Sequence, residues 1–369
     1  MGSFNNQNLP LVSICIPAYN AESTIAETLD TLLAQDYPCL DIVVSDNQST
    51  DNTKAIVQEY ASHGVRYVYH SEGRPDWAAK MPKYIGGFAN WNYVLSQGHG
   101  DYLCLFHSDD LYEPSIVRKQ VLVMLENPQV GAVFTRARRI GEDSRPIKMG
   151  IAKLPKELKG QLKFDFPSLL NAILSSGNFL FTPSVMLRRS VVNKVGGFNE
   201  RQFLTSADLD MWLRIARAGS QIAVINEPLL RYRVSLKQFG SQYNHLRTSL
   251  ADYFMVVDQY LLQPDAKKLV KAPAFSLYKM HRAADQIGCA INFLVKDQAG
   301  EAKTNLLQAL KCAYIMAAFK RPRYLAFFGA GCILLFSSYL GWGVFSGKQI
   351  YKLFQRYLKS QREPIKTKS

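Results

Sequence analysis

The sequence lacks both of the glycine-rich loops that most often bind phosphate groups in α/β proteins. No GxGxxG follows its first apolar run, and GxxxxGK[ST] occurs nowhere in the chain. A diphosphate ligand would therefore need its charge neutralised in another way. A divalent cation held by carboxylates does this, because Mg²⁺ and Mn²⁺ prefer oxygen ligands and commonly bridge aspartate and phosphate oxygens.

The chain also lacks the cysteine pattern of a zinc-binding or disulfide-stabilised domain. Its six cysteines show no CxxC or zinc-site spacing, and several lie within apolar runs, where a free thiol packs as a small hydrophobic group. This favours a reducing compartment. The first ten residues lack a basic stretch followed by an apolar one, so we expect no secretory signal.

Acidic residues are almost absent from the last part of the chain. Residues 311–369 contain eleven Lys and Arg but one acid, Glu363, so they carry +10 of the net charge of +14. The preceding residues are nearly neutral, which argues against a nucleic-acid-binding protein. No low-complexity tract is present either, and with 47% hydrophobic residues most of the chain should fold.

A run of 24 residues without any charge, 324–347, lies within this basic part. As one helix it would be roughly 36 Å long, enough to cross a bilayer. Basic residues lie on both sides of the run, so the positive-inside rule does not predict its orientation in a membrane. Five glycines in the run permit a bend. We therefore expect a re-entrant or interface-embedded segment rather than a simple span, with a buried core helix as the alternative.

The next segment, 348–359, has the pattern of an amphipathic helix. Its basic residues take a different face from its apolar residues, which is typical of a helix on an anionic membrane surface. The apolar residues are Ile350, Leu353, Phe354, Tyr357 and Leu358, and the basic residues are Lys348, Lys352, Arg356 and Lys359.

The first part of the chain alternates between two kinds of segment. Short apolar, β-branched runs predict strands, and the segments between them, such as 25–33 and 117–125, have helical spacing. This alternation predicts an α/β fold with a mostly parallel sheet flanked by helices. The predicted strands are 11–16, 40–45, 65–70, 101–106 and 130–135.

Polar signatures follow three of these strands. They are PAYN at 17–20, DNQSTDNT at 46–53 and HSDD at 107–110. Ligands of parallel sheets bind outside the carboxyl ends of the strands, so we expect the three to meet in one crevice. The alternative for Asp109 and Asp110 is a solvated cap of the helix that should begin near Pro114.

In these motifs the chain resembles the family 2 glycosyltransferases. The resemblance covers about residues 10–240 and implies a Rossmann-like GT-A fold and an inverting transfer from a nucleotide sugar. The segments that carry it are SICIPAYNAESTIAETLDTLLAQDYP, DIVVSDNQSTDNT, the Asp-Asp pair at the end of the fourth run, VGGFNE (195–200) and SADLDMWLRIARAG (206–219).

The resemblance implies a donor site at the strand ends. Asp109 matches the last Asp of the family's DxD signature, which is expected to hold Mn²⁺ or Mg²⁺, and His107 stands where the first Asp is usual. Imidazole is also a Mn²⁺ ligand or a hydrogen-bond donor to ribose or phosphate, so we expect both residues at the metal, with a hydrogen bond to the donor as the alternative for His107. The residues expected around the donor are Pro17, Ala18, Tyr19, Asn20, Glu22, Asp46, Asn92, His107, Ser108, Asp109 and Arg233.

The resemblance also implies the acceptor side. Asp208 matches the general base of inverting members, and Gly197, Phe198 and Trp212 are expected near the acceptor. For Asp208, as for Asp210, the alternative is an acid in the first turn of a helix. Besides His107, three residues depart from the family pattern: Trp91 for a basic residue, Ala207 for the Glu before the base, and Ser235 for a His after the late Arg.

The expected organisation is a GT-A domain over 10–240, a helical region over 241–319 and a membrane-associating segment over 320–369. No QxxRW element occurs and only one long apolar run is present, so a non-processive hexosyltransferase of polysaccharide or cell-envelope synthesis fits best. We expect it on the cytoplasmic face of a bacterial inner membrane, acting on a glycan or lipid-linked acceptor. The alternatives are a polyprenyl-phosphate sugar synthase and an inactive nucleotide-binding or membrane scaffold.

Overall fold

The computed structural model describes residues 9–72, 87–155, 158, 160–236, 238, 242–311 and 322–365. The chain forms two compact units. Unit 1 contains residues 1–169 and 179–234, and unit 2 contains residues 170–178 and 235–369. Helix α5 (Phe166–Ser176) therefore begins in unit 1 and ends in unit 2.

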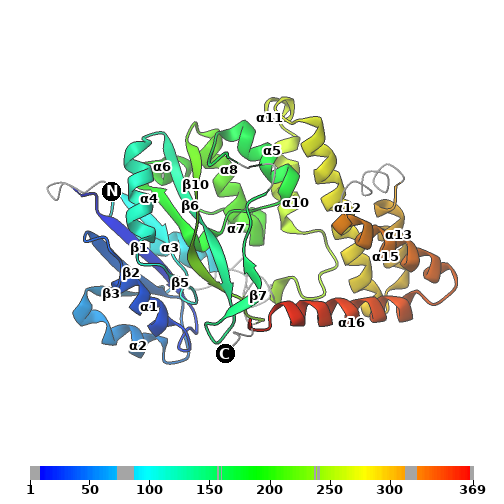
Figure 1. Cartoon of the computed structure of the whole chain (residues 1–369), viewed down its shortest axis with the longest axis horizontal. Helices are drawn as coiled ribbons and strands as arrows, with labels where there is room; N and C mark the ends of the chain where they lie inside the picture. The colour runs from blue at the N-terminus through cyan, green and yellow to red at the C-terminus, as the bar shows by residue number, and fades with distance from the viewer. Residues whose placement is uncertain are drawn as a thin grey trace. The chain divides into compact units, whose positions relative to one another are not determined.

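Unit 1 is built on a sheet with the strand order β3-β2-β1-β4-β9-β6-β10-β5, to which β7 is added beside β6 and β8 beside β10 (Figure 1). The five strands expected from the sequence are all present. The strands are β1 Val12–Ala18, β2 Leu40–Asp46, β3 Val65–Tyr69, β4 Tyr102–Leu105, β5 Leu111–Tyr112, β6 Val130–Ile140, β7 Pro146–Ile151, β8 Lys163–Phe164, β9 Val185–Arg188 and β10 Gln221–Arg233.

The first four strands pair in parallel, as expected, but the rest of the sheet is mixed. Strand β1 runs parallel to β2 and β4, whereas β9 is antiparallel to both β4 and β6. The expectation of a mostly parallel sheet is therefore corrected beyond β4. Apolar runs indicate strands but carry no information on their direction, which is why the sequence did not predict this change.

Helices cover this sheet, and α1 and α2 lie side by side next to β1–β3 (Figure 1). The helical spacing at 25–33 and 117–125 is confirmed by α1 and α4. The helices that belong wholly to unit 1 are α1 Ile25–Leu33, α2 Thr53–Glu59, α3 Gly87–Gln97, α4 Ile116–Glu126, α6 Arg189–Val195, α7 Glu200–Phe203 and α8 Ala207–Arg217.

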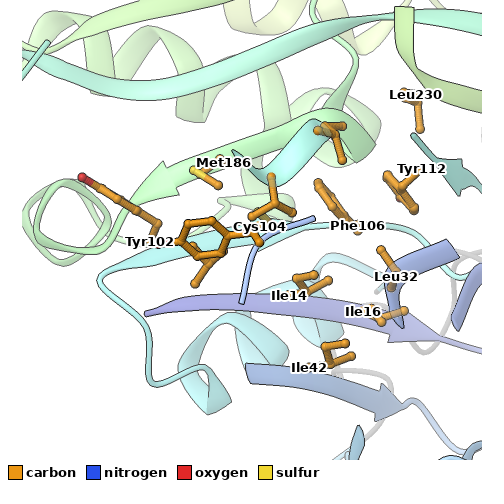
Figure 2. Packing of buried hydrophobic residues seen from close by; sticks show 14 of the residues in the cluster. Ile14, Ile16, Leu32, Ile42, Tyr102, Cys104, Phe106, Tyr112, Met186 and Leu230 are labelled. Atoms are coloured by element: carbon orange, nitrogen blue, oxygen red, sulfur yellow. The ribbon is translucent and has the colours of Figure 1, made fainter. Parts of the chain in front are cut away.

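The core of unit 1 fixes the ends of the central strands. Ile14 and Ile16 of β1 pack with Leu32 of α1, and Phe106 stacks on Tyr112 with ring centroids 4.1 Å apart (Figure 2). Burying large apolar side chains of this kind contributes roughly 1.5–3 kcal/mol each. Because Phe106 is anchored in this core, the polar residues that follow it are held at the edge of the sheet.

Unit 2 is helical in its described residues. Helices α12, α13 and α15 share one core, to which α15 contributes Tyr324, Phe328 and Leu334. The helices are α10 Asp252–Leu261, α11 Pro264–Lys268, α12 Ala272–Val295, α13 Ala299–Ala309, α15 Pro322–Tyr339 and α16 Gly343–Gln361. The segment expected as a separate membrane-associating part thus shares a core with the helical region before it.

The 24-residue apolar run does not form one helix. Helix α15 ends at Tyr339, Gly341 has φ of +79°, and α16 begins at Gly343. A left-handed residue ends a helix, and glycine takes this conformation without steric cost. Within the described residues no helix is both long and apolar enough to cross a membrane. A single 36 Å helix is therefore not what the run forms, whereas the amphipathic helix expected over 348–359 lies within α16.

Candidate active site

The loops after β1 and β2 are tied to each other at the edge of the sheet. The Oδ1 atom of Asn20 accepts the N–H of Thr50 at 2.8 Å, and Oε2 of Glu22 accepts the N–H of Asn52 at 3.1 Å. Pro17 and Ala18 end β1 just before this loop. The two polar side chains thus shape the loops, and their expected contact with a nucleotide stays a prediction.

Tyr19 and Asp46 lie at the same edge with different exposure. Tyr19 is 55% exposed, whereas Asp46 is buried. The carboxylate of Asp46 accepts the N–H of Ser49 and the hydroxyl of Tyr67, both at 2.8 Å. These bonds fix the carboxylate at the end of β2, where the sequence predicts a contact with the base of the donor.

His107, Asp109 and Asp110 form a cluster of potential metal ligands after β4. One ligand atom from each lies within 4.8 Å of the others. Nε2 of His107 and Oδ2 of Asp110 are buried and have no hydrogen-bond partner among the residues that the structure describes. Leaving buried polar atoms unpaired costs roughly 1–3 kcal/mol each, so two of them in one cluster indicate a ligand.

The protonation of His107 and that of Asp110 affect cation binding differently. Burial lowers the pKa of His107 to about 4, so the ring is neutral near pH 7 and can donate a lone pair. Burial and the neighbouring Asp109 raise the pKa of Asp110, so a cation would have to displace a proton from this carboxyl group. A mixed nitrogen and oxygen donor set fits Mn²⁺ well and Mg²⁺ less well. Asp110 was not predicted as a ligand, although its position beside Asp109 was the available signal.

These aspartates do not cap the following helix. Helix α4 begins at Ile116 and its N-cap residue is Ser115. The carbonyl of Ser108 instead accepts the hydroxyls of Thr24 and Thr28, at 2.9 and 3.0 Å. The turn of residues 107–110 is therefore held against α1, and the capping alternative is wrong.

Arg233 holds this turn from the other side. Its guanidinium is buried, donates to the carbonyl of Asp109 at 2.7 Å and pairs with Glu27 at 2.8 Å. Its backbone N–H donates to Oδ1 of Asp110 at 2.8 Å, and Nη1 donates to the carbonyl of Glu142 and to Oγ of Ser144. The sequence suggested a contact with the leaving diphosphate, but these bonds make Arg233 a positioning residue.

Asp208 is the first acid of α8 and is held in a defined orientation. Oγ1 of Thr182 donates to its Oδ2 at 2.6 Å, and the N–H of Leu209 donates to its Oδ1 at 2.6 Å. Burial raises the pKa of Asp208, against the effect of these two bonds. A carboxylate with a raised pKa is a better proton acceptor. Thr182 was not singled out from the sequence, because it lies 26 residues before its partner.

Asp210 lies in the first turn of α8, as the alternative expected, but it is buried and paired instead of exposed to solvent. It is 4% exposed and pairs with Arg214 at 2.7 Å. Arg214 also donates to the carbonyls of Val195 at 2.6 Å and Gly197 at 2.7 Å. The Asp210–Arg214 pair therefore fixes the turn of residues 195–198.

Asn92 holds the same turn through its amide. It accepts the N–H of Phe198 at 2.8 Å and donates to the carbonyl of Phe198 at 3.0 Å. A Cβ atom at position 197 would lie 2.3 Å from Oδ1 of Asn92, so a larger residue there would displace the amide that holds the turn. The structure thus gives Asn92 a part in the turn of residues 195–198, and its expected contact with the nucleotide stays a prediction.

The aromatic residues expected near the acceptor are largely core residues. Trp212 is fully buried and packs edge-on against Phe134 and Phe198, so the expected acceptor contact of Trp212 is corrected. Phe198 is also buried, and Trp91 lies between it and His107, with centroid distances of 5.4 and 4.9 Å. Trp91 thereby connects the turn of residues 195–198 to the metal-ligand cluster.

Comparison with known proteins agrees with this geometry. Residues 13–196 match the family described as glycosyl transferase family 2, and residues 171–258 match glycosyl transferase family group 2. The chain belongs to glycosyltransferase family 2. It is therefore a glycosyltransferase, as the sequence motifs indicated.

Two relatives and the solved structure of a third protein are similar to this glycosyltransferase. An uncharacterized glycosyltransferase of Rickettsia typhi is 28% identical over 62% of this chain and 65% of its own length. The putative teichuronic acid biosynthesis glycosyltransferase TuaG of Bacillus subtilis is 27% identical over 61% of this chain and 79% of its own. The crystal structure of S. aureus TarS 1-349 in complex with UDP-GlcNAc has a TM-score of 0.53 at 17% identity, over 94% of this chain and 92% of that chain. The last likeness shows that the fold is GT-A.

A cavity of about 400 Å³ in the glycosyltransferase is lined by two acids that the sequence did not single out, Glu72 and Glu200. Glu200 is 7% exposed. Burial raises the pKa of Glu200 to about 7, while the N–H groups of Phe88 and Ala89 lower it. Within the described part of the chain its Oε2 atom is buried without a partner.

Glu200 should stabilise the glycosyltransferase less as the pH rises. The folded state binds its proton more tightly than the unfolded chain, in which the pKa of this residue is near 4.5. The contribution of Glu200 to the free energy of unfolding should therefore fall by about 2 kcal/mol between pH 5 and pH 8, whereas the lowered pKa of His107 acts in the opposite direction. Glu200→Gln, which resembles the protonated acid, should lack this contribution, so its change in unfolding free energy between the two pH values should differ from that of the wild type by about 2 kcal/mol in urea unfolding. The same change with pH in both proteins would contradict the assignment.

Proposed function

We propose that the protein is a metal-dependent, inverting glycosyltransferase that moves one sugar from a nucleoside-diphosphate donor to a glycan acceptor. The observation that carries the proposal is the pairing of two features in unit 1. One is the His107–Asp109–Asp110 cluster with its unpaired ligand atoms, and the other is the half-buried carboxylate of Asp208 held by Thr182.

The reaction requires a base on one side of the sugar and charge stabilisation on the other. Asp208 takes the proton of the acceptor hydroxyl as its oxygen forms a bond to the anomeric carbon. The bond from that carbon to the phosphate oxygen breaks, and its electron pair leaves with the nucleoside diphosphate. A Mn²⁺ or Mg²⁺ held by His107, Asp109 and Asp110 would supply positive charge for this leaving group. Direct displacement of this kind inverts the anomeric configuration and needs no covalent intermediate.

Other residues support these steps by orienting groups, although their own bonds do not change in the reaction. Thr182 orients the carboxylate of Asp208, and Arg233 fixes both aspartates of the ligand cluster. His107, Asp109 and Asp110 would hold the cation. Tyr19, exposed at the end of β1, is available to contact the nucleotide.

A panel of nucleotide sugars with and without Mn²⁺ tests the proposal. A ligand that binds only the folded protein raises its unfolding free energy by RT ln(1 + [L]/Kd), or about 2.7 kcal/mol at 100 times Kd. We expect at least one UDP- or GDP-sugar to raise the melting temperature only when the metal is present. The likeness to TarS with UDP-GlcNAc makes UDP-sugars the first donors to test. The absence of any metal-dependent shift across the panel would contradict the proposal.

For the acceptor, we propose a glycan or a lipid-linked glycan of a cell-envelope polysaccharide, extended by one sugar. The relative named for teichuronic acid biosynthesis supports this class. A sugar joined directly to a polyprenyl phosphate is the competing product, and labelled lipid extracts would distinguish it. That product carries phosphate on the anomeric carbon, whereas a glycan product carries a glycosidic bond.

We further propose that unit 2 binds the cytoplasmic face of the membrane as a peripheral surface. Around the bend between α15 and α16, Phe336, Trp342 and Phe345 are each exposed by about two thirds (67–68%). The described part of α16 carries Lys348, Lys352, Arg356 and Lys359 and no acid. Exposed aromatics beside basic residues match an interface of anionic lipids.

Substitutions in this surface should weaken membrane binding without removing the core of unit 2. Replacing both Trp342 and Phe345 by Ser should lower binding to phosphatidylglycerol vesicles by ~10-fold or more, because two large apolar groups no longer enter the lipid. Leu262→Ser, at an apolar position with 82% exposure, is the matched control and should bind normally. Truncation at residue 319 is unsuitable, since α15 supplies core residues. Normal vesicle binding by the double variant would contradict the proposed membrane-binding surface.

A further inference from the structure

Arg139 is a half-buried cation on β6 that has no carboxylate partner among the residues that the structure describes. Its guanidinium carbon lies 5.7 Å from the ring centroid of Phe181, and Nη1 is 3.5 Å from the carbonyl of Met149. Burial lowers the pKa of Arg139, so holding the charge there costs free energy. Unpaired charges at such a cost are more common at functional sites than elsewhere.

Arg139 also contacts two segments that continue into the proposed reaction centre. One continues to the metal-ligand cluster and the other to the base Asp208. In the β6–β10 pairing it is opposite Tyr232, whose ring packs edge-on against Phe181 at 5.6 Å. The residue after Tyr232 is Arg233, which bonds to both Asp109 and Asp110. The residue after Phe181 is Thr182, which orients Asp208.

Electrostatics agree with this placement. Burial is the largest cause of the raised pKa of Tyr232. The charges of Asp110 and Asp109 raise this pKa further, while the charge of Arg139 lowers it. The charges of both aspartates and of the guanidinium therefore all act on the Tyr232 hydroxyl. Arg139 thus lies near the ligand cluster. Phe181, whose ring it faces, is followed in the chain by Thr182, which holds the base Asp208.

We propose that Arg139 binds an oxyanion, a carboxylate or a phosphate, that one of the two sugar substrates carries in addition to the donor's diphosphate. This rests on the proposed transfer reaction. A guanidinium over an aromatic ring can still offer its planar N–H edge for two parallel hydrogen bonds, a geometry that matches carboxylate and phosphate. Phe181 precedes Thr182, which holds Asp208, so we expect the oxyanion near the reacting sugar. Arg139 would then select acidic over neutral substrates.

Paired probes that differ by one charge test this inference. UDP-glucose and UDP-glucuronate, and GDP-mannose and GDP-mannuronate, differ only at C6 of the sugar, and they test a charge on the donor. Methyl glucoside and methyl glucuronide, added to protein saturated with UDP or GDP and Mn²⁺, test a charge on the acceptor. Dissociation constants are measured for the wild type, Arg139→Met and the control Arg138→Met, whose arginine is exposed on the same strand.

In at least one of the two arms, the wild type and Arg138→Met should bind the acidic probe ~10-fold or more tightly than the neutral one. Arg139→Met should lose this difference while binding free UDP or GDP normally. Without ligand it should be at least as stable as the wild type, because a costly unpaired charge is removed. A structural role for Arg139 predicts lower stability instead.

Three results would overturn the inference. One is equal binding of acidic and neutral probes by the wild type in both arms, and another is a preference that survives in Arg139→Met. The third is an equal weakening of every nucleotide in Arg139→Met, which would make the guanidinium a diphosphate ligand. If the wild type binds no nucleotide with Mn²⁺, the proposed function fails too; if it binds nucleotide without charge preference, the Arg139 inference alone fails.

Discussion

Asp109→Ala should abolish the metal-dependent binding of nucleotide to this glycosyltransferase. The cation loses a principal carboxylate ligand while the diphosphate keeps its charge, so the remaining His107 and Asp110 cannot hold both. In the wild type, nucleotide and Mn²⁺ at about 100 times Kd should raise the unfolding free energy by about 2.7 kcal/mol, and the variant should gain close to none. Thermal unfolding with Mn²⁺ or EDTA measures this directly.

The matched control is Asp101→Ala. Asp101 is an exposed acid immediately before β4, at the opposite end of the strand from the ligand cluster. This variant should show the full gain in stability with nucleotide and metal. An undiminished gain in Asp109→Ala would place the metal elsewhere, and a loss in both variants would point to general damage to β4.

Asp208→Asn should lower the rate of sugar transfer by ~10²-fold or more and leave donor binding nearly unchanged. The amide cannot accept the proton of the acceptor hydroxyl, whereas its shape is almost that of the carboxylate. The hydrogen bond from Thr182 can persist to the amide oxygen. Initial rates at saturating donor, together with the dissociation constant of donor and metal, separate these two effects.

Two further variants make this prediction sharper. Thr182→Val removes the bond that orients Asp208 and should give a smaller loss of rate, ~10-fold, at unchanged donor affinity. Glu126→Gln, in an exposed acid at the end of α4, should behave as the wild type. Asp210→Asn is a poor control, because it breaks the buried pair with Arg214. Full activity in Asp208→Asn would remove this residue as the base.

The sequence predicted those parts of the site whose position depends only on neighbouring residues in the chain. Each β-branched run forms a strand, and the residues after it lie at its carboxyl end whatever the rest of the fold does. Asp46 and His107 are therefore found where their strands place them. The pairing of β1 with β2 and β4 then brings the polar loops to one edge.

The parts that escaped prediction depend on contacts between distant segments. Arg233 bonds to a turn 124 residues earlier in the chain, and spacing alone cannot indicate such a partner. Trp212 lies on the same helix as Asp208, and only the packing of α8 decides that its ring enters the core. For the charge-free run the glycines indicated that a bend was possible, but the sequence could not show that the bend would be at Gly341.

The most direct test of the account is the release of nucleoside diphosphate by the wild type from a panel of UDP- and GDP-sugars, with cell-envelope glycans or lipid extracts as acceptors. The account predicts that one donor yields nucleoside diphosphate with Mn²⁺, that EDTA stops the release, and that the new glycosidic bond has the anomeric configuration opposite to the donor's. Release that continues at the same rate in EDTA, or a product that retains the donor's configuration, would contradict it.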